Sequence, residues 1–266
     1  AGDLTVTGGA DMTWSSKGGT TTGNGLGIGS NYTLKGSGEL ANGWTHDLTI
    51  AVANANAFSA ATINLGMGGL GKLSFDQGNS GNGIAAFDDK MPTAWEESWG
   101  AGLSTGVRLP LGSGASQNVM YTTPTVLGTT MTFTLAPDYG TSDTGDKATA
   151  NSGDGWDQSM DATININPSL GTEILSSLNV YAAASSIEAQ HYKAAADDKY
   201  EGVAGVTYDI GPLSLGAQVS ADYTGIDSED KGNQAGAYNT YKNWAFGVAF
   251  NVNDDLSISY GGWEAK

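Results

Sequence analysis

Apolar and polar residues alternate with a period of two along most of this chain. Leu4, Val6 and Trp14 share one parity, and the residues between them are mostly Asp, Thr and Gly. The same alternation recurs near 26–37, 44–52, 62–67, 72–76, 130–135, 160–167, 213–223, 243–252 and 255–260. Because successive side chains of a β-strand point to opposite faces, this pattern predicts strands with one apolar and one polar face.

Soluble β-sandwiches also alternate, so the period alone does not separate them from membrane barrels. Three further features favour a barrel in a membrane. Aromatic residues stand near the ends of the apolar faces, where membrane barrels carry interfacial girdles: Trp14, Trp44, Tyr223, Trp244 and Tyr260. The other parity is polar throughout, which leaves no second apolar set for a soluble core. The third feature is the length of the connections.

Short and long connections follow one another along the chain. The short ones are 41–43, 68–71, 124–128, 167–171, 211–212 and 253–254; the long ones are 15–24, 55–60, 78–115, 138–156, 185–199 and 225–241. Outer-membrane barrels have short turns on one side and long loops on the other. The sequence therefore predicts an all-β fold, a transmembrane antiparallel β-barrel formed by residues 1–266 as a single domain.

Residues 99–109 alternate well enough to form a strand of their own. Counting them would put the long loop 138–156 on the short-turn side, so we expect one long third loop, 78–115, followed by a sixth strand at 116–123. The total is then thirteen strands. Bacterial single-chain barrels have even numbers and an open edge in lipid is not viable. We therefore expect a sixteen-stranded barrel whose closing C-terminal strands are missing from this sequence.

Composition excludes several other classes of protein. No apolar run approaches the roughly 20 residues of a transmembrane helix. The chain has no Cys, which excludes disulfide scaffolds and thiol catalysis. Its net charge is −17, with 11 basic residues against 28 acids, so we expect no nucleic-acid partner. The start, AGDLTV, reads as a mature N-terminus left after removal of a signal peptide.

The segment KLSFDQGNSGNGIAAFDDKMPTAWEES resembles the porins of marine alphaproteobacteria, the Pelagibacter type. The segments SGELANGWT, VAGVTYDIGPLSLGAQVS and VAFNVNDDLSISYG are similar too, and the likeness is densest at 71–98. The resemblance implies a general porin of the bacterial outer membrane, with sixteen strands and its third loop folded into the lumen. It implies a homotrimer among outer-membrane lipid and lipopolysaccharide, through which small hydrophilic solutes pass by diffusion.

The third loop carries four acids around Lys90: Asp88, Asp89, Glu96 and Glu97. Inside a narrow aqueous channel these carboxylates would act strongly on a passing ion. Lys35 and Lys72, of lumen parity, and Arg108, within the loop, are the candidates for the opposite charge at the constriction. The net acidity predicts a preference for cations and neutral solutes. The alternative is that these acids are solvated loop charges, or that they fix the shape of the loop.

Two motifs match enzyme signatures. Gly66-x-Gly68-x-x-Gly71 fits a dinucleotide fingerprint, but a strand is expected after it where that fold requires a helix. Gly102-x-Ser104-x-Gly106 fits a nucleophile elbow, for which only His191 could serve as the base. His46, the other histidine, has lipid-facing parity. We therefore expect that the protein is not an enzyme and binds no cofactor.

Several alternatives stay open. Acids of the outer loops leave room for a bound Ca²⁺ ion: Asp138, Asp143, Asp146, Asp154, Asp157, Asp227, Glu229 and Asp230. A substrate-selective channel could stack sugars or nucleosides on Trp95 or Trp99. A non-channel surface β-protein, such as an adhesin or array protein, is the rival from another class. The second loop, 54–59, either latches onto a neighbouring subunit or is a simple exposed loop.

Overall fold

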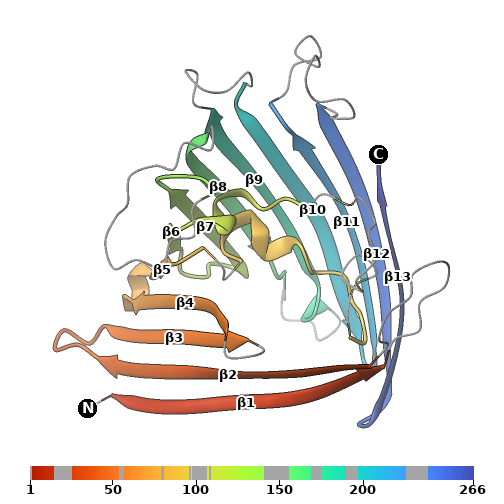
Figure 1. Ribbon diagram of the computed structural model, residues 1–266, viewed down its shortest axis with the longest axis horizontal. Helices are drawn as coiled ribbons and strands as arrows, with labels where there is room; N and C mark the ends of the chain where they lie inside the picture. Colours follow the sequence, from red (N-terminus) through yellow and green to blue (C-terminus); the bar gives the residue numbers. More distant parts are fainter. Residues whose placement is uncertain are drawn as a thin grey trace.

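A single antiparallel sheet of thirteen strands makes up the described part of the protein, in a computed structural model (Figure 1). The structure describes residues 2–14, 26–53, 57–78, 81–95, 97, 107, 109–140, 156–168, 175–189, 197–225 and 239–266. Each strand pairs with its neighbours in the chain, as a period-two sequence with hairpin connections predicts. The thirteen strands that we expected are therefore confirmed.

The first half of the sheet leads into the long third loop. Its strands are β1 (Asp3–Trp14), β2 (Leu26–Glu39), β3 (Thr45–Ala53), β4 (Ala57–Gly66) and β5 (Lys72–Asp76). The 3₁₀ turn η2 (Gly68–Leu70) joins β4 to β5. The loop between β5 and β6, here called L3, comprises residues 77–117 and contains the 3₁₀ turns η3 (Gly83–Phe87) and η4 (Gly112–Ala115). No described helix is long and apolar enough to cross a membrane.

The second half of the sheet forms the wall that L3 meets. Its strands are β6 (Asn118–Thr122), β7 (Thr129–Ala136), β8 (Trp156–Ile166), β9 (Asn179–Ala189), β10 (Lys199–Ile210), β11 (Leu213–Tyr223), β12 (Thr240–Asn253) and β13 (Leu256–Ala265). β5 pairs directly with β6, so no strand lies between them in the sheet and no described residue of L3 forms one.

The sheet curves strongly, and L3, drawn in yellow in Figure 1, lies on its concave side. Within the described part of the chain β1 pairs with β2 alone and β13 with β12 alone. The closure of the barrel by sixteen strands stays a prediction.

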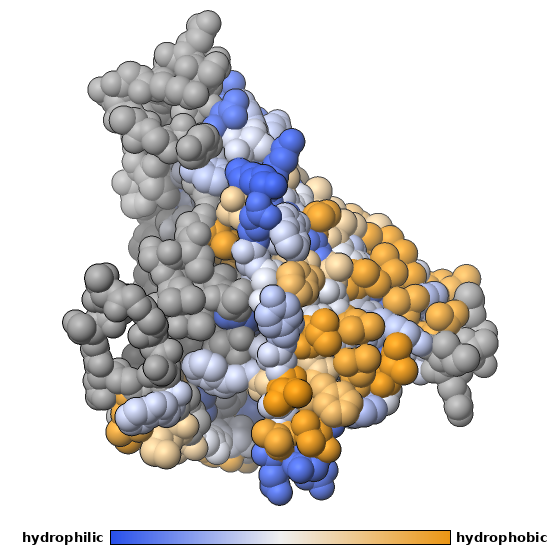
Figure 2. Space-filling view, turned by 90° about the vertical axis from the view of Figure 1, so that its right-hand side faces the viewer, coloured by the Kyte–Doolittle hydropathy of each residue, from blue (hydrophilic) through white to orange (hydrophobic). Residues whose placement is uncertain are grey.

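The convex face of the sheet is apolar and exposed. Leu4 is 74% exposed, Ile28 75% and Tyr260 73%. Figure 2 faces the side on which β12 and β13 run and shows a broad hydrophobic patch with hydrophilic residues above and below it. Monomeric soluble proteins rarely expose contiguous apolar surface on this scale. An apolar band between two polar rims matches the hydrocarbon core of a membrane instead.

Three expected connections differ from those in the structure by more than two residues at one end. The loop expected at 185–199 is shorter, because β9 continues to Ala189 and β10 begins at Lys199. The connection after β8 extends over 167–178 and does not end at 171, because a turn in which the Leu178 N–H donates to the Leu175 carbonyl precedes β9. The second loop is shorter than the expected 55–60, because β4 begins at Ala57, which pairs with Ala53. The side chains of 57–59 lie outside the described residues.

The concave face is not polar throughout, which corrects a second expectation. Tyr181, Ile187 and Val203 point to this side from β9 and β10 and are buried. Tyr181 and Val203 form a small cluster with Ile84 and Phe87 of η3. Tyr181 and Val203 occur on the inner wall here because η3 of L3 covers them.

The outer face generates a stability prediction. Phe133 lies in the middle of β7 on the convex face, between Tyr121 of β6 and Ala162 of β8. A lysine facing the bilayer midplane costs about 2–4 kcal/mol. We therefore expect F133K to unfold more readily than F133A by about this amount in lipid vesicles, as measured by denaturant titration of tryptophan fluorescence.

The matched control is on the concave face. Thr49 of β3 shares the lumen parity, so T49K should differ from T49A by much less, because a lysine there stays in water. Equal losses at the two positions would mean that the convex face does not meet lipid.

Candidate functional site

L3 folds back across the concave side of the sheet and is attached at several points along its length. η3 and η4 contact each other and the strands β7, β8 and β9. The attachment begins at Gly78, whose N–H donates to the carboxylate of Asp76 at the end of β5. L3 therefore narrows the space that the sheet encloses.

The carboxylate of Asp161, on β8, joins the two 3₁₀ turns. Its Oδ2 accepts the backbone N–H of Ile84 in η3 over 3.0 Å. Its Oδ1 accepts both the N–H and the hydroxyl of Ser113 in η4, each over 3.0 Å. Asp161 and Ser113 are both buried. One side chain of the wall thus holds two parts of the loop that are far apart in sequence.

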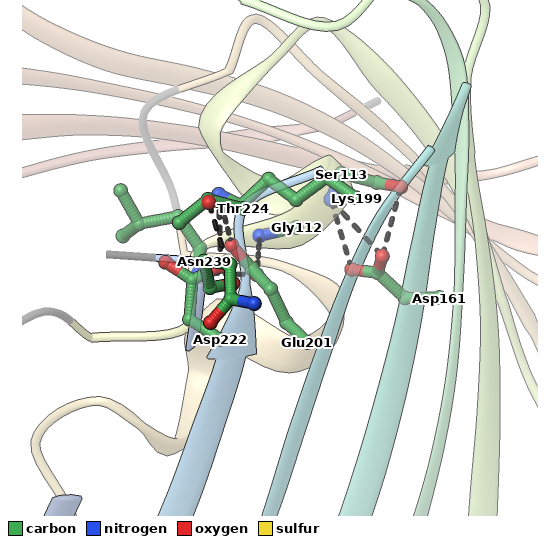
Figure 3. A network of polar contacts seen from close by, with 9 residues as sticks. Gly112, Ser113, Asp161, Lys199, Glu201, Asp222, Thr224 and Asn239 are labelled. Carbon is green, nitrogen blue, oxygen red and sulfur yellow. Dashed lines mark hydrogen bonds and ion pairs between the residues drawn. The ribbon is translucent and has the colours of Figure 1, made fainter. Parts of the chain in front are cut away.

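A second carboxylate holds the approach to η4. Oε2 of Glu201, on β10, accepts the N–H groups of Leu111 over 2.9 Å and Gly112 over 2.7 Å. The ammonium of Lys199 lies 2.5 Å from Oε1 of Glu201 and 3.7 Å from Oδ1 of Asp222 on β11. Figure 3 shows that Glu201 and Asp222 come from neighbouring strands and lie close to Gly112 of the loop. Because the cation sits between two acids, the buried charges are partly compensated.

Glycine allows this close approach at two loop positions. Gly83 and Gly112 have φ of +62° and +45°, in the left-handed region. A Cβ at either position would also collide with the Asp161 carboxylate. The glycines therefore let the backbone turn and let the carboxylate reach it.

An apolar contact lies beside the polar ones. The rings of Phe87 in η3 and Tyr181 in β9 stack with centroids 4.6 Å apart and planes 2° apart. The Tyr181 hydroxyl donates to Oε1 of Gln218 on β11. Ile84 is fully buried in the same cluster.

Farther along L3, Met91 and Pro92 lie on β11 and β12. A Cβ on Gly216 would collide with the Pro92 ring, and one on Gly247 would collide with the Pro92 backbone. Gly216 and Gly247 are direct partners across the two strands. Their missing side chains leave the place that Pro92 fills.

Asp88, Asp89 and Lys90 lie between these two attachments. Asp88 ends η3 and is half-buried, whereas Asp89 and Lys90 are exposed. Burial, and to a smaller extent the neighbouring Asp89 carboxylate, raise the pKa of Asp88 to about 6. The Lys90 ammonium lies 5.9 Å from the centroid of the Phe87 ring. The loop therefore presents two acids and one base where it spans the lumen.

The other residues predicted for a constriction are dispersed. Glu97 is buried, in a small cavity that Thr93 and Trp263 also line. Lys35 lies within β2 opposite Thr49, and Lys72 begins β5 at the short-turn end. No described ion pair joins Asp88 or Asp89 to either lysine. Glu96 and Arg108 lie outside the described residues, and a constriction role for all these residues stays a prediction.

The predicted interface aromatics lie at several heights on the sheet. Trp14 and Tyr223 end β1 and β11 on the long-loop side, and Trp44 precedes β3 on the short-turn side. Trp244 pairs with Glu264, and Tyr260 pairs with Val248 nearer the middle of β13. Sequence reasoning missed Tyr200, whose ring lies 6.4 Å from that of Tyr223, and Phe246, which contacts both Trp244 and Tyr260.

The structure gives no support to the dinucleotide motif and does not describe the residues of the nucleophile-elbow motif. Gly66 ends β4, and the strand β5 follows the glycine turn, as expected for a hairpin. Ser104, His191 and Trp99 lie outside the described residues, and Trp95 is exposed. Of the loop acids considered for Ca²⁺, Asp138 and Asp157 are described and the others are not, so that prediction stays untested.

Sequence reasoning also missed the residues that hold L3. Asp161 and Asp222 were recognised only as polar-parity residues, and Lys199 was assigned to a loop that in fact ends before it. The signal in the sequence is that charged residues of lumen parity recur on the neighbouring strands β8, β10 and β11. Charged side chains are rarely buried without a partner, so such a group indicates a contact with another segment.

The Asp161 contacts lead to a prediction about the loop. D161N keeps the size of the side chain but replaces charged acceptors by an amide, and hydrogen bonds to charged groups contribute about 1.5–3 kcal/mol. We expect the amide hydrogens of Ile84 and Ser113 to exchange about thirtyfold faster, which corresponds to about 2 kcal/mol. Hydrogen exchange with mass spectrometry of L3 peptides measures this.

Asp47 supplies the control. Its carboxylate accepts from the Asn64 amide on the same face of the sheet, over 2.9 Å, and is not bonded to L3. D47N should leave the exchange of L3 unchanged. If D161N left it unchanged too, Asp161 would not hold the loop.

Comparison with known proteins identifies a family and several similar structures. A family described as Gram-negative porin matches residues 1–266. A search of curated proteins found no match. Among solved structures, an anion-selective porin from Comamonas acidovorans shares 15% identity over 100% of this chain and 80% of its own, with a TM-score of 0.58.

Two other structures are similar over the whole chain. Salmonella typhi OmpF, in complex with daunomycin, shares 14% identity with this chain. The match covers 100% of this chain and 79% of OmpF, with a TM-score of 0.61. The outer membrane channel DcaP of Acinetobacter baumannii shares 11% identity. The match covers 100% of this chain and 79% of DcaP, with a TM-score of 0.58. At these identities the structures show the fold, whereas the family match spans the entire sequence. The chain therefore belongs to the Gram-negative porins, β-stranded channel proteins of the bacterial outer membrane.

Proposed function

We propose that this porin lets small hydrophilic solutes diffuse passively across the outer membrane, with a preference for cations and neutral solutes. The mechanism is size exclusion and electrostatic filtering at L3, without covalent chemistry. The observation that carries the proposal is the attachment of L3 on both sides of Asp88–Lys90, which holds two acids and one base in the path of a solute.

The charge of L3, and not the fold, is the basis of the proposed cation preference. A porin described as anion-selective has the same fold, so the fold alone does not set the sign of the preference. Asp88 and Asp89 are adjacent, and Lys90 compensates one of them. A narrow aqueous channel strengthens the effect of the remaining negative charge on a passing ion.

Removing the two charges tests this mechanism. We expect D88N/D89N to lower the cation/anion permeability ratio several-fold in planar bilayers, measured as a shift of the reversal potential in a KCl gradient. D254N/D255N is the matched control, because this acid pair lies in the turn between β12 and β13, far along the chain from L3. A reversal potential unchanged by D88N/D89N would refute the role of these acids.

The raised pKa of Asp88 gives the selectivity a pH dependence. The Asp88 carboxylate is charged above about pH 6 and neutral below it. The cation preference should therefore fall as pH decreases through about 6, and D88N should lack this step. Reversal potentials recorded between pH 8 and 5 measure it, and a step of equal size in D88N would assign it to another group.

Three finer statements belong to this proposal. The resemblance at 71–98 supports a porin of the marine alphaproteobacterial type. It also supports a homotrimer, for which the exposed apolar side chains of β1 and β2 offer a surface. A Ca²⁺ ion on the outer loops is retained as a hypothesis on the basis of their acids.

A further inference from the structure

A cavity of about 600 Å³ lies between η3 and the wall formed by β6 to β9. It extends toward the short-turn side of the sheet, since Gly128 and Asn167, next to the turns, also line it. Its volume falls within the range of small-molecule sites. It is distinct from the acids of the proposed filter, because neither Asp88 nor Asp89 lines it.

The wall of this cavity carries hydroxyls and amides in register. Thr132 of β7 pairs directly with Thr163 of β8, and Thr130 pairs with Asn165 one step along the same face. The two pairs lie about 7 Å apart, which is two residues along a strand. Both pairs are therefore within reach of a single disaccharide-sized molecule.

These groups have hydrogen-bonding capacity left over. The Thr132 and Thr163 hydroxyls share one hydrogen bond of 2.6 Å, and those of Thr125 and Thr130 share one of 2.8 Å. In each pair one hydroxyl donates, so the hydrogen of the other remains for a solute. Each hydroxyl oxygen also has lone pairs that can accept, and at most one of them is used within a pair. The threonines that line the site thus offer both donors and acceptors.

Charge and apolar surface narrow the class of solute. Lys90 is the one charged residue among the described residues that line the cavity. No described lining residue carries a carboxylate and Lys90 is positive, so the cavity favours a solute without positive charge. Phe87 and Met120 add apolar surface, against which the C–H groups of a sugar can pack.

We propose that this cavity is a weak binding subsite for neutral, hydroxyl-rich solutes of disaccharide size. The proposal rests on the proposed channel function and deepens it. Several simultaneous hydrogen bonds to adjacent hydroxyls are what Thr130, Thr132, Thr163 and Asn165 can supply. The site would retain such a solute beside the filter, where it would partly obstruct the ion current.

Sucrose is the probe for the test. We expect it to reduce the ion current of the reconstituted protein in planar bilayers in a saturable manner. A polyethylene glycol of matched hydrodynamic radius should reduce the current without saturation, because its ether oxygens cannot donate. In T132V/T163V the sucrose affinity should fall about tenfold, as expected for two lost hydrogen bonds.

The matched control is T49V/T62V. Thr49 and Thr62 are also direct partners of lumen parity, on β3 and β4, but they do not line the cavity. This variant should keep the sucrose affinity of the original protein. N165L is a second test, which should also weaken sucrose binding and which leaves the Thr132–Thr163 bond in place.

The outcomes separate the two proposals. A protein without ion conductance would refute the channel function itself. A conducting protein in which sucrose and the polymer act alike, or in which T132V/T163V and T49V/T62V bind sucrose equally, would overturn the subsite alone.

Discussion

The arrangement of the lumen depends on the carboxylate of Asp161. It accepts N–H groups from η3 and η4, two segments of one loop that no helix or strand holds together. Hydrogen bonds to ionised acceptors are roughly twice as strong as neutral ones, and Asp161 is buried, where few waters can compete. The position of η3 in turn sets where Asp88 and Lys90 lie and how much space remains above β7 and β8. The proposed selectivity and the proposed solute subsite thus both depend on how this wall residue orients the loop.

Apolar packing and carboxylate bonds contribute to this attachment in different ways. Burying Ile84 and Phe87 stabilises the docked loop by about 1.5–3 kcal/mol for each side chain. Each hydrogen bond to a charged group contributes about the same. Hydrophobic contact has little directionality, so it attaches the loop without fixing its orientation. The bonds to Asp161 and Glu201 have defined donors, and they fix which part of L3 faces the lumen.

Much of the barrel could be predicted from sequence, because lipid on one side and water on the other impose a period of two. The strand order and the extent of L3 follow from it. The attachment of L3 could not be predicted in the same way. Ile84 and Asp161 are 77 residues apart, and no local pattern links them. The inward Tyr181 and Val203 are apolar because L3 covers them, so their sequence suggests a lipid-facing side until the loop is placed. Glu201 lies just inside β10, whose start had been assigned to a loop.

Gly216 and Gly247 have a consequence for how such a channel can change over evolution. Pro92 rests where their side chains would be, so the width of the passage is set partly from the wall, by atoms that are missing. A single methyl group there would displace the loop toward the open side and alter the bore while leaving the sequence of L3 untouched. The aperture is therefore encoded partly in the strands β11 and β12, whereas the charges are encoded in L3 itself.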